Sequence, residues 1–161
     1  MTTPTDTPPT DTPPTDTPLA ETPLALYIHW PFCRAKCPYC DFNSHVAQEI
    51  DHARFAAAYR REMAHMAAHY GAGRKLVSVF IGGGTPSLMP PALVATILGD
   101  AERHFGFADD VEITAEANPT SSEAAMFAGF RAAGVNRISL GVQSLRDAGL
   151  DFLGREHSVA D

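Results

Sequence analysis

From residue 24 onward, short runs rich in β-branched and aromatic residues alternate with longer stretches of helical periodicity. LALYIH and LVSVFI are typical of strands, and a later run alternates Val111, Ile113 and Ala115 with polar residues. Asp109 and Asp110, just before that run, are expected to form a polar turn. The pattern predicts strands over residues 24–29, 76–81, 111–116 and 135–142, helices over 49–70, 90–105 and 121–133, and a last helix beginning near Ser144.

The first predicted helix has one clear apolar face. Phe55, Tyr59, Met63, Met66 and Tyr70 follow one another at spacings of four, four, three and four residues. We therefore expect this face, including both methionines, to join the core. The helix is expected to end at Gly71 and Gly73, and a second glycine, Gly134, ends the third helix. His65 and His69 lie off the apolar face, so a solvated surface is expected for them rather than a zinc site.

Four successive strand–helix units indicate a parallel sheet, because parallel strands need crossover connections. A flat doubly wound sheet and a barrel both satisfy this pattern. Polar residues on one strand face favour a partial parallel (β/α) barrel, whose interior and strand ends can hold a polar site. These residues are Glu112, Thr114, Glu116, Arg137, Ser139 and Gln143.

Residues 1–23 differ from the rest in composition. They hold seven of the thirteen prolines, the repeat DTPPT and four acidic residues without a Lys or Arg. We expect a disordered or polyproline-like extension, solvated rather than used for docking. Of the formal net charge of −7 over 161 residues, about −3 remains for residues 24–161. That balance argues against a nucleic-acid partner, and no stretch is long and apolar enough for a membrane span, so the cytoplasm is the expected compartment.

Three cysteines follow the first predicted strand in a C-x3-C-x2-C pattern, at Cys33, Cys37 and Cys40. An odd number of cysteines within eight residues suggests metal or redox chemistry rather than a disulfide framework. Such a loop can provide three thiolates to a [4Fe-4S] cluster and leave one iron open for an exchangeable small molecule. The alternative is zinc, with His29 or His45 as the fourth ligand.

The cysteine loop, with Tyr39 before its last cysteine, resembles the signature of the radical S-adenosylmethionine (SAM) superfamily. LYIHWPFC, CPYCDFNS, FIGGGTPSLM, EITAEANP and GVNRISLGVQS resemble, in order and spacing, the oxygen-independent coproporphyrinogen III oxidase-like family. This resemblance implies a partial barrel with six β/α units, of which residues 24–161 would hold about four. We therefore expect the chain to be a truncated N-terminal part of the core domain, with the edge of its fourth strand unpaired.

The resemblance also assigns residues to cofactors. Cys33, Cys37 and Cys40 would hold the cluster, and an electron from the cluster would cleave SAM to a 5'-deoxyadenosyl radical and methionine. A glycine run alone is more often a plain turn, and a strand-end acid alone is more often merely exposed. By resemblance, however, SAM-contact positions are Tyr27, Tyr39, Gly83, Gly84, Thr85, Glu116, Gln143 and Arg155; no catalytic residue is assigned.

One branch of the family carries a further cysteine two positions after the loop. Here Cys40 is followed by Asp41, Phe42 and Asn43, so the chain resembles the branch of haem chaperones. The expected partners are SAM, haem or a porphyrin, an electron donor for the cluster and an unidentified haem acceptor. The alternatives are a coproporphyrinogen III oxidase that uses the radical and a zinc-held interaction module, so the resemblance leaves enzyme and chaperone both open.

Overall fold

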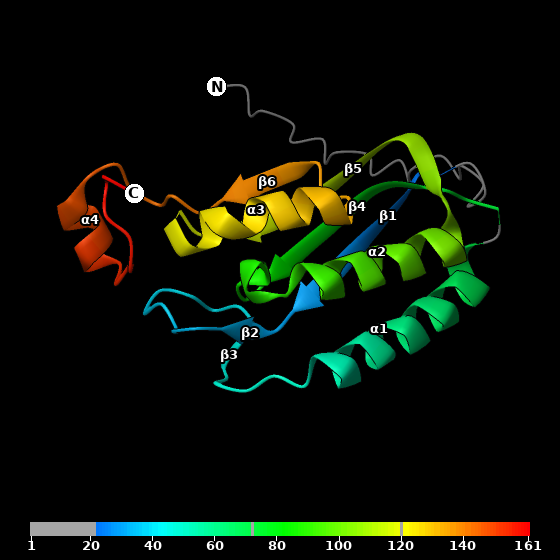
Figure 1. The fold of residues 1–161 in the computed structure, drawn as a ribbon, viewed down its shortest axis with the longest axis horizontal. Coiled ribbons are helices and arrows are strands. Elements are labelled where there is room, and N and C mark those ends of the chain that lie inside the picture. The colour runs from blue at the N-terminus through cyan, green and yellow to red at the C-terminus, as the bar shows by residue number, and fades with distance from the viewer. Residues whose placement is uncertain (1–21, 72, 120) are drawn as a thin grey trace, which may run out of the picture.

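A computed structural model describes residues 22–71, 73–119 and 121–161 (Figure 1). Nearly all of the proline-rich segment expected at residues 1–23 lies outside the described residues. The strands are β1 (Leu24–Trp30), β2 (Phe32–Cys33), β3 (His45–Val46), β4 (Leu76–Gly83), β5 (Phe107–Ala117) and β6 (Arg137–Leu140). The helices are α1 (His52–Met66), α2 (Pro91–Phe105), α3 (Ser121–Ala133) and α4 (Asp147–Phe152), with a π-helical turn (Ala67–Gly71) and a 3-10 turn (Pro86–Leu88).

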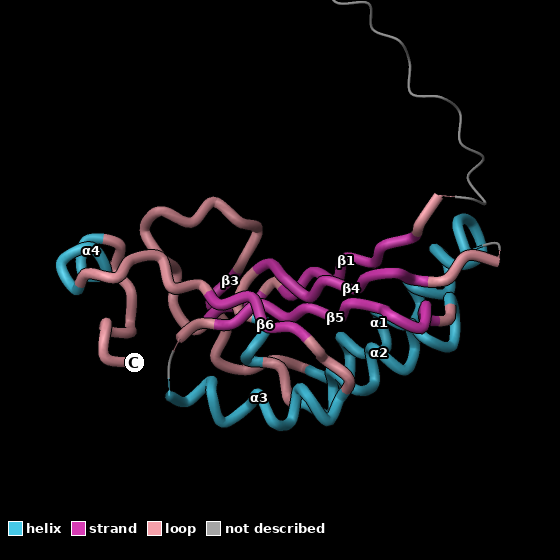
Figure 2. The backbone as a smooth tube through the Cα atoms, turned by 90° about the horizontal axis from the view of Figure 1, so that it is seen from above, coloured by secondary structure: helices cyan, strands magenta, loops and turns pink. Residues whose placement is uncertain are grey.

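The main sheet contains four parallel strands in the order β1-β4-β5-β6, and β2 and β3 form a separate parallel pair. Neighbours in this sheet follow one another along the chain. α1, α2 and α3 all lie on the same face of the sheet, as Figure 2 shows. A doubly wound sheet would reverse its strand order and carry helices on both faces. The arrangement therefore confirms the barrel-type α/β fold that the polar strand faces predicted.

The apolar face of the sheet packs against α2 to form the core. Val79 and Ile81 of the central strand β4, and Val94 and Ile97 of α2, are at most 1% exposed. α2 in turn packs between α1 and α3. Trp30, at the end of β1, is fully buried and packs edge-on against Phe32, with ring centroids 5.1 Å apart. The core therefore extends to the end of β1, where the cysteine loop begins.

The face predicted for α1 is only partly correct. Met63 is 4% exposed, but Met66 is 39% exposed and Tyr70 53%, so neither of these two belongs to the core. For Tyr70 the reason is the π-helical turn over Ala67–Gly71, which inserts an extra residue per turn and rotates Tyr70 away from the apolar face, whereas Met66 is the last residue of α1 and precedes this turn. His65 and His69 are exposed, as expected, and a ring nitrogen of His69 bonds the His65 carbonyl at 2.7 Å.

β5 begins earlier than predicted, so Asp109 and Asp110 lie within the strand and not in a turn. Its pairing with β4 shifts between the Leu76–Phe107 and Ser78–Glu112 partners, and the exposed aspartates lie in this irregular stretch.

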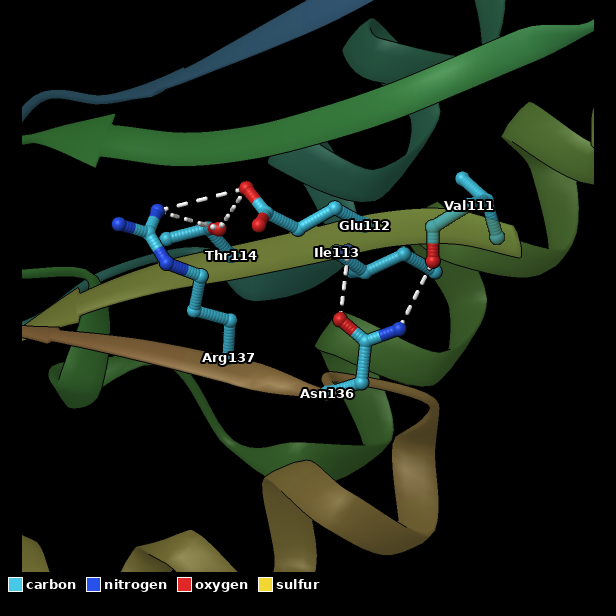
Figure 3. Close-up of polar contacts among 6 residues, drawn as sticks. All are labelled: Val111, Glu112, Ile113, Thr114, Asn136 and Arg137. Carbon is cyan, nitrogen blue, oxygen red and sulfur yellow. Dashed lines mark hydrogen bonds and ion pairs between the residues drawn. The ribbon is translucent and has the colours of Figure 1, made fainter.

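β6, by contrast, is shorter than predicted, and the side chain of Asn136 provides the pairing just before it (Figure 3). The Ile113 amide donates to Asn136 Oδ1 at 2.8 Å, and Asn136 Nδ2 donates to the Val111 carbonyl at 2.8 Å. The Asn136 backbone amide also donates to the Ile113 carbonyl at 3.0 Å, so backbone and side chain of Asn136 together extend the pairing with β5 just before β6 begins.

Asp100 is a buried, charged side chain at the contact between α1 and α2. Its side chain is 2% exposed, and it accepts hydrogen bonds from Arg60 of α1, at 3.0 Å, and from Arg103 one turn further along α2. Burial raises the pKa of the Asp100 carboxyl, but the hydrogen bonds and charges of the two arginines outweigh burial and hold that pKa below its usual range. The ionised form therefore stabilises the packing of the two helices.

Replacing this carboxylate with the neutral amide in Asp100→Asn should lower the free energy of unfolding at pH 7 by about 1–3 kcal/mol. Because the native pKa lies below the unfolded one, the stabilisation is complete above about pH 4 and is lost as the pH falls through the native pKa. Urea unfolding from pH 7 to pH 3 should therefore show the two proteins converging. The exposed Asp109→Asn is the control and should change stability by less than about 0.5 kcal/mol. A pH-independent difference for Asp100→Asn would contradict this account.

Candidate functional site

The carboxyl ends of the parallel strands meet at one edge of the sheet and surround a cavity of about 210 Å³. The loop between β2 and β3, the turn after β4, the ends of β5 and β6 and the segment after α4 all line it. Figure 1 shows α4 and the loop between β2 and β3 toward the same end of the molecule. Parallel topology thus gathers segments that are far apart in the sequence, as is usual for ligand sites in α/β proteins.

All three cysteines line this cavity as free thiols. Cys33 is buried at the end of β2, whereas Cys37 and Cys40 are partly exposed in the loop that follows. The Cys40 amide donates to the Cys37 carbonyl at 3.0 Å, which closes a tight turn between these two residues. The loop therefore presents its thiols to one space.

The turn after β4 runs unusually close to the chain that leaves β1. The Gly84 amide donates to the Trp30 carbonyl at 2.6 Å, and the Thr85 amide donates to the Phe32 carbonyl at 2.7 Å. A Cβ atom on Gly84 would lie 2.5 Å from the Phe32 carbonyl oxygen, and Gly83 adopts a φ of +113° that side chains disfavour. The glycines are therefore required by the close approach of two backbones, and not only by a turn.

Glu116 stands at the carboxyl end of β5 and lines the same cavity. Its Oε2 accepts a hydrogen bond from the Gly83 amide at 3.1 Å, which fixes the carboxylate against the glycine turn. Tyr27, on β1, is exposed on the face of the sheet opposite the helices and stacks on Phe80 with ring centroids 6.1 Å apart. Burial, followed by the charge of Glu116, raises the pKa of the Tyr27 hydroxyl.

Arg155 connects the segment after α4 to the rest of the site. Its Nη1 donates to Cys37 Sγ at 3.4 Å and to the Tyr39 hydroxyl at 3.2 Å. Its Nη2 donates to Asn118 Oδ1 at 2.5 Å and to the Gly141 carbonyl at 3.0 Å. Its Nε is buried and has no hydrogen-bond partner within the described part of the chain. One guanidinium thus joins the cysteine loop to the ends of β5 and β6.

Seven of the eight side chains or glycines expected to contact SAM line the cavity: Tyr39, Gly83, Gly84, Thr85, Glu116, Gln143 and Arg155. Tyr27 does not, although it lies close enough to Glu116 for their charges to interact. Gln143 has a φ of 63°, a left-handed backbone conformation that is uncommon for a residue with a side chain.

Several further residues line the cavity without having been predicted as site residues, and the polar side chains of Lys36 and Asn118 are among them. Asn118 accepts from Arg155, and Lys36 donates to backbone carbonyls of its own loop. Only the position of Lys36, a basic residue between two cysteines, gave a local signal. Asn118 gave none beyond its place after a strand.

The two histidines proposed as a fourth zinc ligand make other contacts or face solvent. His29 Nε2 bonds the Asn43 carbonyl at 2.9 Å, and His45 is exposed on β3. Among the residues that the structure describes, no three His, Cys, Asp or Glu side chains converge as ligands of a single ion. Within the same residues, no helix combines the length and apolar content needed to cross a membrane.

Comparison with known proteins places these observations in a family. The model of the radical SAM superfamily matches residues 27–161. Radical S-adenosyl methionine domain-containing protein 1, mitochondrial, from Bos taurus is 44% identical over 137 residues, which cover 85% of this chain and 31% of that protein. Heme chaperone HemW from Escherichia coli is 46% identical over 134 residues, covering 83% and 35% respectively.

A solved structure, that of coproporphyrinogen III oxidase (HemN) from Escherichia coli, a radical SAM enzyme, matches with a TM-score of 0.76 and 31% sequence identity. The match covers 86% of this chain and 32% of that one. The chain therefore spans about a third of the length of the relatives it matches.

The close approach at the glycine turn can be tested with a pair of glycine substitutions. Gly84→Ala places a methyl group against the Phe32 backbone and should reduce the free energy of unfolding by about 1–3 kcal/mol. Gly99→Ala, in α2, meets nothing within 4 Å and should be neutral or stabilise by up to about 1 kcal/mol. Urea denaturation of both variants checks this. Equal stability of Gly84→Ala and the unmodified chain would show that the two backbones can separate freely.

Proposed function

The chain belongs to the radical SAM superfamily over residues 27–161, and from this premise we propose that residues 24–161 form part of the core of a haem chaperone. In this proposal Cys33, Cys37 and Cys40 hold a [4Fe-4S] cluster, and SAM binds beside it at the strand ends. The observation that carries the proposal is the cavity itself, because three free thiols, a glycine turn and a strand-end carboxylate from separate elements all line it.

The cysteines suit a cluster better than a single ion. In a [4Fe-4S] cluster each thiolate binds a different iron, so the sulfur atoms surround the cluster and need not converge on one point. A tetrahedral zinc site requires four ligands within about 2.3 Å of one ion. Three thiols distributed along one cavity-lining loop fit the first requirement, and the cation of Arg155 beside Cys37 offsets part of the negative charge that thiolates bring.

The other residues of the cavity suit SAM. When bound, the cluster and SAM together would supply the one-electron chemistry, and the protein would bind and orient them. Backbone groups of Gly83, Gly84 and Thr85 can approach the methionine end of SAM closely because no Cβ intervenes at the glycines. Glu116, held by its bond to Gly83, keeps Oε1 available for ribose hydroxyls. Arg155 can exchange its present partners for the SAM carboxylate.

Two observations favour a chaperone over an enzyme acting on coproporphyrinogen. The chain is 46% identical to the HemW protein of Escherichia coli and 31% identical to the HemN protein of the same organism. Cys40 is followed by Asp41, Phe42 and Asn43, with no fourth cysteine in the loop. Haem is therefore the proposed cargo, with an electron donor and a haem acceptor as protein partners. We also propose a cytoplasmic location, because three closely spaced free thiols are typical of reducing compartments.

The structural likeness to HemN supports coproporphyrinogen III oxidase chemistry as the second candidate. Both candidates share the cluster and SAM, so the cofactor test and the substrate test must be separate experiments.

Anaerobic incubation of the chain with iron and sulfide should load about four iron and four sulfide per chain and produce the broad absorbance of a cluster. Replacing Cys33, Cys37 or Cys40 with serine should abolish loading, because each thiolate holds one iron. His45→Ala should load normally, since His45 is exposed on β3. Metal analysis and absorbance spectroscopy give the readout. Stoichiometric zinc without cluster absorbance would favour the zinc module and overturn the cluster proposal.

The reduced, cluster-loaded protein should produce no protoporphyrinogen from coproporphyrinogen and SAM, and it should retain added haem through gel filtration. Chromatographic analysis of the porphyrin products and haem absorbance in the protein fraction measure the two outcomes. The serine variant of Cys37 provides the cluster-free control. Protoporphyrinogen formed by the loaded protein and absent from this control would establish the oxidase instead.

A further inference from the structure

Lys36 lies between Cys33 and Cys37, and its ammonium group bonds across the cysteine loop. Nζ donates to the Phe42 carbonyl at 3.0 Å and to the Ser44 carbonyl at 3.3 Å, and it lies 3.5 Å from Ser44 Oγ. An ammonium group has three donors and no acceptor, so these oxygens match its full hydrogen-bonding capacity. The contact joins the part of the loop that carries the first two cysteines to the part that returns after Cys40.

The returning part of the loop is itself fixed to the sheet. The His45 amide donates to the Pro31 carbonyl at 2.7 Å, and a ring nitrogen of His29 bonds the Asn43 carbonyl at 2.9 Å. Ser44 is only 6% exposed. Lys36 therefore bonds to backbone that already has a fixed position. These bonds restrain the position of Cys37, the next residue in the chain.

We infer that Lys36 is a positioning residue that closes the cysteine loop before any cluster binds. A loop of this length without regular structure loses much conformational freedom when its thiols are placed around one cavity. A charged hydrogen-bond donor that spans the loop lowers that entropic cost at the binding step, because the ordering is already present. The loop closure stands on the hydrogen bonds alone, whereas its role in holding a cluster rests on the proposed function.

Arg34 separates this role from a simple effect of charge. It lies two residues before Lys36, carries the same charge, is exposed and lines the same cavity. Its side chain makes no hydrogen bond or ion pair to any residue in the described ranges. If Lys36 acts only through its charge, removing either cation has the same effect. If Lys36 closes the loop, only its own removal opens it.

The test compares Lys36→Met with Arg34→Met and Lys36→Arg in the full 161-residue chain. Without a cluster, hydrogen exchange of the peptide over residues 33–46 should be about tenfold faster in Lys36→Met and unchanged in Arg34→Met. After the cluster is loaded, an iron chelator should remove iron about tenfold faster from Lys36→Met than from the unmodified chain. An effect of this size is typical when a residue that orients metal ligands is replaced. Lys36→Arg, which can still donate to the carbonyls, should recover most of both losses. Exchange within β4 should stay unchanged in all three, which excludes global unfolding.

Equal exchange and equal iron loss in Lys36→Met and the unmodified chain would overturn the inference, as would identical effects of Lys36→Met and Arg34→Met. If Lys36→Met does not fold, the test rests on Lys36→Arg alone. Loss of the loop's protection from hydrogen exchange in Lys36→Arg would then contradict the positioning role of Lys36. If the unmodified chain takes up no cluster, the proposed function fails. In that case the exchange of the cluster-free protein still shows whether Lys36 closes the loop.

Discussion

Two hydrogen bonds beyond the ends of β1 and β4 determine the geometry of the site. The Gly84 amide bonds the Trp30 carbonyl, and the Thr85 amide bonds the Phe32 carbonyl, so the pairing of the two strands continues into the loops that follow them. The cysteine loop begins in this stretch, which means that the sheet fixes where the first thiol lies. Since a Cβ on Gly84 would collide with the Phe32 backbone, this continuation depends on glycine. The rest of the cavity is arranged around this contact, including Glu116, which bonds the neighbouring Gly83.

The one-sided packing of helices explains why a polar site can exist beside so small a core. Residues of β1, β4 and β5 alternate between the buried face, which α2 covers, and a face that no helix covers in Figure 2. On the uncovered face Arg137 donates to Glu112 and Thr114, and both members of the Arg137–Glu112 pair are 54% exposed (Figure 3). Charged side chains keep their hydration there, so the fold does not need to compensate their burial. A doubly wound sheet would have buried Arg137 and Glu112 under a second layer of helices.

Local patterns predicted the elements well because strand and helix periodicity are local properties. All four main strands overlap the predicted ones, although β5 is longer and β6 shorter than predicted, and the helix ends at Phe105 and Ala133 are observed where the patterns indicated. The errors arise where the backbone departs from regular periodicity. A π-helical turn displaces Tyr70, and a shift in strand pairing places Asp109 inside β5. The cysteine spacing identified the candidate cluster loop for the same local reason.

The contacts across the site could not be predicted in this way, because they join residues that no pattern relates. Arg155 reaches Cys37 over 118 positions, and only the folded sheet brings the two together. Lys36 is the opposite case, since its partners lie within eight positions and the loop can form that closure by itself. The candidate site therefore combines a locally closed cysteine loop with a second wall assembled from separate β/α units. In the proposed function the cysteine loop holds the cluster and the second wall holds SAM. Binding of the cluster therefore depends on local contacts, whereas binding of SAM depends on the tertiary fold.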